Sequence, residues 1–202
     1  MQYKEVIKNP LPKLAIFVSG NGSNMASIIE SSKNKSLRAE VKVVISNDPE
    51  AEAINKAKEL GIETIIINHK FYKDRKQFEK VILSNIGQYK LDLICLAGFM
   101  RLFSDYFISK CKLPIINIHP SLLPKYKGLE AFERAFKAKD KEAGCTMHHV
   151  IEEMDEGEII LQKKFEIDYK LSLAENKKTL HKLEHLAFIE AIKIVLKNTI
   201  AK

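Results

Sequence analysis

Short apolar runs alternate with amphipathic segments through the first half of the chain, and this alternation is the strongest constraint on its fold. The apolar runs have the length of buried strands and predict strands at 14–19, 41–46, 63–67 and 91–97. The segments between them have helical periodicity and predict helices at 25–32, 49–60 and 74–88. Strands and helices that alternate in this way form a parallel sheet with right-handed crossovers.

The second half of the chain has a different pattern. It predicts a short strand at 114–118, a helix at 129–138, and strands at 146–151 and 158–167 that face each other across Asp155-Glu156-Gly157. A long helix follows, in which apolar residues recur near helical spacing: Leu180, Leu183, Ala187, Ala191 and Ile194. The predicted fold is therefore α/β: a Rossmann-like, mostly parallel sheet with helices on both faces and an antiparallel C-terminal extension. No repeat or linker divides the sequence, so we expect a single domain over 1–202, with halves of about 13–112 and 113–202.

The chain is basic, since 33 Lys and Arg residues outnumber 26 Asp and Glu residues and give a formal net charge of +7. Nucleic acid is the first partner that such a balance suggests. The lysines, however, are scattered through every segment, without a basic run or interleaved aromatic residues. We therefore expect a solvated basic surface that attracts anionic small molecules, and no nucleic-acid partner.

The three cysteines, Cys95, Cys111 and Cys145, are odd in number and widely spaced, so they predict neither a disulfide framework nor a zinc site. His181 and His185 have helical spacing but lack the glutamate of H-E-x-x-H, and we expect no metal. No apolar stretch is long enough to span a bilayer. The run 14–18 is too short for a signal peptide. These features indicate a reducing cytoplasm.

The stretch Ile116-Asn117-Ile118-His119-Pro120-Ser121-Leu122-Leu123-Pro124 places an amide and an imidazole at the end of an apolar run. Side chains at i and i+2 of a strand point to the same face, so Asn117 and His119 can converge on one substrate atom. The prolines end the strand and stiffen the loop that follows. The pair suits a reaction in which negative charge develops on a carbonyl oxygen, because both side chains can donate hydrogen bonds and His119 can also move a proton. A capped strand end without chemistry is the alternative.

The segment Ser19-Gly20-Asn21-Gly22-Ser23-Asn24 lies between the first strand and the first helix. Its glycines allow a tight turn and close approach of a ligand, and a helix N-terminus offers free N–H groups to an anion. The spacing does not match G-x-G-x-x-G, and the lysine of a P-loop is missing. A site for a single phosphate therefore fits better than a dinucleotide site. A turn with Ser23 or Asn24 near the helix cap remains the alternative.

A second loop, Leu96-Ala97-Gly98-Phe99-Met100-Arg101-Leu102-Phe103, follows the fourth strand at the edge where open α/β sheets bind ligands. Its apolar side chains and free backbone suit a flat heterocycle, although a buried loop would have a similar sequence.

Asp155 stands in an acidic turn, Glu152-Glu153-Met154-Asp155-Glu156-Gly157. A carboxylate beside an imidazole orients the ring and favours its charged form, but the sequence alone does not bring Asp155 to His119. His148 and His149 are neighbours on a strand and point to opposite faces, so we expect that they do not both reach one site.

Taken together, G-N-G-S-N, L-A-G-F-M-R, N-I-H-P-S-L-L-P and M-D-E-G-x-I-I-L-Q occur in the order and at the distances of a known family. From about Lys13 to Ala191 the chain resembles the phosphoribosylglycinamide formyltransferases, which are folate-dependent enzymes of purine synthesis. The resemblance implies transfer of the formyl group of 10-formyltetrahydrofolate to the amine of 5′-phosphoribosylglycinamide in de novo purine (IMP) biosynthesis. It implies a cytoplasmic enzyme of small-molecule substrates without metal, nucleic acid or membrane partner, as a monomer or weak homodimer.

The resemblance also implies roles for individual residues. Asn117, protonated His119 and Asp155 would form the catalytic group. The first two would stabilise the oxyanion, and Asp155 would keep His119 charged and help to carry a proton. The ribonucleotide, including its phosphate and ribose, would be bound by Gly22, Ser23, Asn24, Met25, Ala26 and Glu184. The folate would be bound by Arg75, Met100, Arg101, Leu102, Phe103, Asn117, Val150, Ile151, Glu152, Glu153 and Met154. The N-terminal half would then bind phosphate, and the C-terminal half would carry the catalytic and folate residues.

The sequence departs from the family's pattern near the catalytic loop. Glu130 stands where many relatives have a histidine, and Lys127 and Phe132 replace commoner residues. These departures affect contacts near the loop rather than the catalytic group.

Three rival functions use the same features. A formyltetrahydrofolate hydrolase and a methionyl-tRNA formyltransferase usually carry a further domain, which we do not expect here. A nucleotide-binding module without chemistry would have lost Asn117, His119 or Asp155, and all three are present. We therefore expect the transferase.

Overall fold

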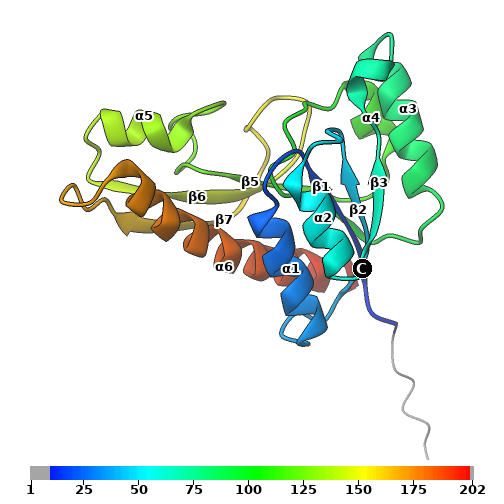
Figure 1. Cartoon of the computed structure of the whole chain (residues 1–202), viewed down its shortest axis with the longest axis horizontal. Helices are drawn as coiled ribbons and strands as arrows, with labels where there is room; N and C mark the ends of the chain where they lie inside the picture. Colours follow the sequence, from blue (N-terminus) through cyan, green and yellow to red (C-terminus); the bar gives the residue numbers. More distant parts are fainter. Residues whose placement is uncertain (1–9, 201–202) are drawn as a thin grey trace, which may run out of the picture.

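The computed structural model describes residues 10–200, in which seven strands form one sheet in the order β3-β2-β1-β4-β5-β6-β7 (Figure 1). The strands are β1 Lys13–Val18, β2 Glu40–Ser46, β3 Glu63–Ile66, β4 Leu93–Leu96, β5 Ile115–His119, β6 Glu142–His149 and β7 Ile159–Glu166. Every pair among the first five is parallel, whereas β6 pairs antiparallel with β5 and β7 antiparallel with β6. The predicted α/β fold with an antiparallel C-terminal extension is confirmed.

Helices cover both faces of this sheet. They are α1 Ser23–Lys33, α2 Glu52–Glu59, α3 Arg75–Ile86, α4 Asp105–Lys110, α5 Ala131–Lys137 and α6 Leu173–Ile200, with a short 3-10 turn η1 at His69–Phe71. Because strand residues alternate between faces, Leu14 and Ile16 of β1 pack with α1, α2, α5 and α6. Ala15 and Phe17 pack on the opposite face with α3 and α4. Helices α1 and α6 lie side by side on the first of these faces (Figure 1).

Local sequence explains several element boundaries. Asp74 caps α3, since its carboxylate accepts the N–H of Gln77 at 2.8 Å. The helix expected at 49–60 begins only at Glu52, because Ala51 is extended and its N–H bonds back to Asp48 in a turn. Neither α4 nor η1 was expected, since such short elements show no periodicity.

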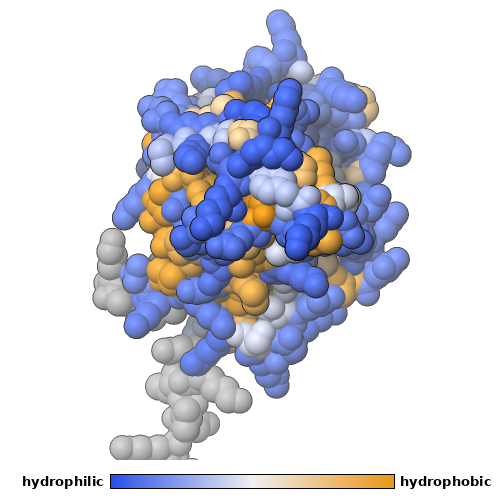
Figure 2. Space-filling model, turned by 90° about the vertical axis from the view of Figure 1, so that its left-hand side faces the viewer, coloured by the Kyte–Doolittle hydropathy of each residue, from blue (hydrophilic) through white to orange (hydrophobic). Residues whose placement is uncertain are grey.

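The apolar stripe of α6 also differs from the expectation at one residue. Leu180, Ala187 and Ala191 are buried as predicted, but Ile194 is 37% exposed. The buried stripe continues instead through Val195, four residues after Ala191, as helical geometry favours. On the side of the molecule where α5 lies, hydrophilic side chains project between hydrophobic areas (Figure 2).

Candidate active site

The loops after β1 and β4 touch at the carboxyl edge of the parallel strands, where the strand order changes direction. The backbone N–H of Ser19 donates to the carbonyl of Gly98 at 3.1 Å, and Oγ of Ser19 accepts the N–H of Met100 at 2.7 Å. Open α/β sheets bind ligands at such a switch point. The glycine-containing loop 19–24, predicted as a phosphate site, and the apolar loop 96–103 are therefore neighbours.

A cavity of about 410 Å³ opens at this edge, between the loop after β4, the end of β5, and the segment between β6 and β7. It is lined by all the residues that the resemblance assigns to folate except Arg75: Met100, Arg101, Leu102, Phe103, Asn117, Val150, Ile151, Glu152, Glu153 and Met154. Arg75 is exposed at the start of α3 and is not part of this lining. His119, Asp155 and Glu130 also line the cavity.

The cavity wall carries large apolar side chains that remain exposed. Leu129 is 78% exposed, Met100 66%, Leu102 51% and Met154 46%. Scattered exposed apolar residues are ordinary, but a group that converges on one cavity marks a surface that a ligand covers. The size and chemistry of this wall suit a flat heterocycle.

Asn117 is held by His148 on the neighbouring strand, because the antiparallel register places the two residues opposite each other. Nδ1 of His148 donates to the carbonyl of His149 at 2.9 Å, so Nε2 is left as the acceptor of the neutral ring. The amide nitrogen of Asn117 lies 3.2 Å from this Nε2 and donates to it. One amide N–H of Asn117 is thereby used, and the second remains available to a ligand oxygen.

The charge state of His148 fits this role. Burial lowers its pKa from the ordinary value, while the bond to His149 and the nearby Asp155 carboxylate oppose the shift. A neutral His148 can accept from Asn117. In a protonated ring, Nε2 would carry a hydrogen that faces the amide N–H of Asn117, and no hydrogen bond could form between them. Burial of His148 therefore fixes the orientation of the Asn117 amide.

His119 contacts an acceptor with each ring nitrogen. Its Nε2 donates to the carbonyl of Tyr126 at 2.8 Å, and its Nδ1 lies 3.4 Å from Oδ2 of Asp155. A doubly protonated ring satisfies both acceptors. In this arrangement the amide of Asn117 keeps one N–H for a ligand, whereas His119 must release one contact before it can donate to one.

Asp155 lies between the two imidazoles. Its Oδ1 is 3.7 Å from Nε2 of His148, and its Oδ2 also accepts the N–H of Gly128 at 2.9 Å. The residue has a left-handed backbone (φ 58°), which turns its side chain out of the acidic loop. Its side chain is 8% exposed, so this carboxylate is removed from solvent, whereas the neighbouring Glu153 and Glu156 are exposed.

The loop before α1 is shaped for close packing. Gly22 has φ 78°, and a Cβ atom there would lie 2.6 Å from Cβ of Ala53 in α2. No side chain caps α1 at Gly22, so the first-turn N–H groups are open to an anion. The side chain of Met25 is buried, which leaves its backbone as the part that can meet a ligand.

Glu184 of α6 reaches this same loop. Its Oε2 accepts the amide N–H of Asn24 at 3.0 Å, although 160 residues separate the two in the chain. Burial raises the pKa of Glu184, and the bond from Asn24 opposes the shift. The structure thus brings together the residues that the resemblance assigns to phosphate and ribose.

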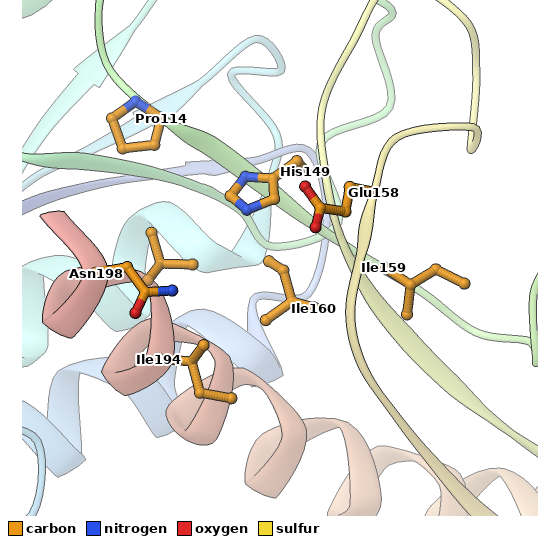
Figure 3. A pocket seen from close by; sticks show the side chains of 8 residues that line it. Pro114, His149, Glu158, Ile159, Ile160, Ile194 and Asn198 are labelled. Carbon is orange, nitrogen blue, oxygen red and sulfur yellow. The ribbon is translucent and has the colours of Figure 1, made fainter.

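A second cavity, of about 570 Å³, lies at the other end of the sheet near the end of α6. Figure 3 shows Ile194 and Asn198 of α6 on one side of it and Pro114 and His149 across from them. His148 and His149 do point to different sites, as their alternation predicts. Asn117, His119 and Asp155 do not line this second cavity, so it lacks the predicted chemistry.

Sequence reasoning missed His148 as a part of the site. Its contact with Asn117 depends on how β6 pairs with β5, and a one-residue slip would have turned it away. The backbone groups of Tyr126 and Gly128 were also missed, because nothing in a sequence marks a carbonyl or N–H that a folded loop directs inward.

Within residues 10–200, no group of three or more His, Cys, Asp or Glu side chains is arranged to hold a metal ion. In the same part of the chain, no helix combines the length and apolar character that crossing a membrane requires.

Comparison with known proteins places these features in context. Residues 12–192 match the protein-family model described as formyl transferase. The phosphoribosylglycinamide formyltransferase of Bacillus subtilis is 39% identical over 92% of this chain and 95% of its own length. The human trifunctional purine biosynthetic protein adenosine-3 is 37% identical over 93% of this chain, which spans only 19% of that longer protein. Glycinamide ribonucleotide transformylase 1 from Geobacillus kaustophilus superposes with a TM-score of 0.88 at 32% identity, over 93% of this chain and 100% of that one.

Proposed function

Because the chain belongs to the formyl transferase family, we propose that its carboxyl-edge site transfers the formyl group of 10-formyltetrahydrofolate to the amine of 5′-phosphoribosylglycinamide. This is a one-carbon transfer of purine (IMP) biosynthesis. One observation carries the proposal: Asn117, His119 and Asp155 line one cavity, together with the apolar side chains of the loop after β4. The adjoining loop before α1 and Glu184 supply a polar site for the phosphorylated acceptor.

The described residues fit the folate. Its flat ring would be surrounded by the apolar side chains of Met100 and Leu102 and by the segment from Val150 to Met154. Its formyl group would lie beside Asn117. Arg101 at the wall and Arg75 beyond it are the cations that could meet the acidic tail.

The reaction forms a bond from the substrate amine to the formyl carbon and breaks the bond from that carbon to N10 of the folate. Negative charge develops on the formyl oxygen, and the second amide N–H of Asn117 is the donor available to it. His119, once it releases Tyr126 or Asp155, is the second donor. The amine loses a proton that N10 must gain, and the Asp155–His119 pair is the group that can carry it.

A single sheet runs through residues 10–200 with one core on each face, which supports one formyltransferase domain over 1–202. We assign the chain to the cytoplasm, as a monomer or weak homodimer that acts on small molecules and not on nucleic acid or membranes. The scattered lysines support the absence of a nucleic-acid partner, since they form no basic stripe in the sequence.

The test is an assay of 10-formyltetrahydrofolate deformylation with and without the ribonucleotide acceptor. Deformylation should require 5′-phosphoribosylglycinamide and yield its N-formyl product in equal amount. Equal rates without the acceptor would instead indicate a hydrolase that uses water at the same site.

A further inference from the structure

A carboxylate lies in the protein interior outside the catalytic group. Glu79, in the middle of α3, is 0% exposed. Its Oε1 accepts the backbone N–H of Ser104 at 2.7 Å, and its Oε2 accepts the hydroxyl of the same residue. Both carboxylate oxygens are therefore directed at a single residue.

Packing does not explain this carboxylate. Glutamate is almost never fully buried without a partner, because removing its charge from water is costly. Where a buried charged group is replaced together with its partner, an apolar residue of similar volume is often neutral or stabilising. The neighbouring α3 residues Phe78, Ile82 and Ile86 are buried apolar side chains, so the surroundings would accept one.

Ser104 stands at the end of the apolar loop. It follows Phe103 directly, and it precedes α4 in the capping position, but its hydroxyl makes no capping bond to that helix. The hydroxyl is used by Glu79 instead. At the other end of the loop, the N–H of Met100 donates to Ser19. Between these anchors the loop exposes Met100 and Leu102 at the cavity.

Aromatic side chains connect the loop Met100–Phe103 to α4 and β1. Phe103 stacks on Phe107 of α4 with ring centroids 3.8 Å apart, and on Phe99 at 5.5 Å. Phe17 of β1 meets both Phe99 and Phe103 edge-on. A shift at Ser104 would therefore move the Phe103 wall of the cavity as well as the start of α4.

We propose that Glu79 is a positioning residue for the folate subsite: it holds Ser104 away from its capping role and thereby fixes the loop Met100–Phe103 in its binding shape. This inference rests on the proposed function for the identity of the ligand. Glu79 acts through Ser104 and is outside the cavity lining, so substitutions there should weaken folate binding without changing the ribonucleotide site or the catalytic group.

The decisive variant is Glu79→Leu, which removes both acceptors and frees Ser104 to cap α4. We expect the dissociation constant for tetrahydrofolate, measured by calorimetry under nitrogen, to rise on the order of tenfold, since tenfold corresponds to about 1.4 kcal/mol, roughly one bond to a charged group. The KM for the ribonucleotide and the kcat at saturating folate should stay within about twofold of wild type, a difference too small to reflect a lost hydrogen bond. Glu79→Leu leaves the N–H of Ser104 without its acceptor and should lower the melting temperature. The contrast between weakened folate binding and unchanged ribonucleotide kinetics therefore separates positioning from a structural role.

Glu79→Gln is the rescue variant. Its carbonyl can still accept the N–H of Ser104, and its amide can donate to the hydroxyl, so folate binding should stay near that of wild type. Ile86→Val is the matched control, because Ile86 is buried in the same helix but has no polar group. It should lower stability slightly and leave the folate dissociation constant unchanged.

Hydrogen exchange tests the structural half of the inference without any substrate. The amides of 100–104 should exchange faster in Glu79→Leu and in Ser104→Ala than in wild type or Ile86→Val. Unchanged exchange, or unchanged folate binding by Glu79→Leu, would overturn the positioning role.

If wild type binds folate but transfers no formyl group to the ribonucleotide, the proposed function fails while the positioning role stands. If wild type binds no folate, both fail.

Discussion

Oδ2 of Asp155 lies 3.4 Å from Nδ1 of His119, although His119 ends β5 and Asp155 lies in the loop between β6 and β7. The same oxygen accepts the N–H of Gly128, and the other ring nitrogen of His119 donates to Tyr126. The pair is thus oriented from both sides by the backbone of the 126–128 segment. Orientation of this kind is what a proton-transfer pair requires before a substrate arrives.

The first prediction follows from this arrangement. His119→Ala and Asp155→Asn should each lower kcat on the order of 100-fold or more, as loss of one oxyanion donor does in other enzymes. The double variant should lose little more than either single one, because residues that act as a unit are not additive. Kinetics with both substrates varied would measure this. Losses that multiply in the double variant would mean that the two residues act independently.

The second prediction concerns His148 and pH. In the unfolded chain His148 has its ordinary pKa of 6.5, whereas burial lowers the pKa in the folded protein. As pH falls through 6.5, the unfolded chain binds a proton that the folded protein excludes, so the free energy of unfolding falls until the folded pKa is reached. Above 6.5 the contribution of the neutral ring is complete.

His148→Gln should flatten this part of the stability profile, because glutamine does not titrate and its carbonyl can still accept from Asn117. Urea unfolding between about pH 7 and pH 5, around the ordinary histidine pKa, measures the effect. The pKa of His185 is also lowered by burial, but it contributes to both proteins, so the difference between the two profiles reports His148. Stability profiles of wild type and His148→Gln with the same slope between about pH 7 and pH 5 would contradict the prediction.

The fold was predictable because its signals are local. Buried strands such as β2 and β4 are recognisable from their own composition, although β4 is shorter than the predicted 91–97, and parallel order follows from the helices between the strands. In the same way, Asn117 and His119 could be paired because alternation on a single strand needs no long-range information.

The remaining parts of the site depend on contacts between distant segments. Asp155 meets His119 only because the loop between β6 and β7 turns back over β5, with Asp155 itself in a left-handed conformation. His148 depends on strand register, and Glu184 on the packing of α6 against α1. Several neighbouring acids have the same chemistry as Asp155, so composition could not single it out.

The third prediction concerns Gly22. A side chain at this glycine would obstruct close approach of a phosphate, and it would also collide with Ala53. Gly22→Ala should therefore destabilise the protein by about 1 kcal/mol or more, through the left-handed backbone as well as the collision, and raise the KM for the ribonucleotide. Gly20→Ala is the control, since a Cβ there meets no atom within 4 Å. Thermal unfolding of both variants would measure the loss of stability apart from the change in KM. A Gly22→Ala variant as stable as Gly20→Ala would argue against the collision.

The fourth prediction concerns Glu184. Burial raises its pKa above the ordinary 4.5, so between 4.5 and the folded pKa the folded protein binds more protons than the unfolded chain. Stability therefore declines as pH rises through this window, and the cost of the buried charge is fully present above it. Glu184→Gln removes this cost, while its carbonyl can still accept from Asn24. The variant should melt at a higher temperature than wild type at pH 7, and the difference should shrink toward pH 4.

The stabilisation should come with weaker binding of the acceptor. If the Glu184 carboxylate accepts from the ribose, its replacement should raise the KM for 5′-phosphoribosylglycinamide on the order of tenfold, because a bond to a charged group becomes a bond to a neutral one. The KM for the folate should not change. Glu190→Gln is the control on the same helix: Glu190 pairs with Lys163 at an exposed site, where an ion pair contributes little. It should alter neither stability nor KM by more than the error of measurement. A Glu184→Gln variant that is less stable at pH 7, or that binds both substrates as wild type does, would mean that the carboxylate serves the fold and not the ribonucleotide.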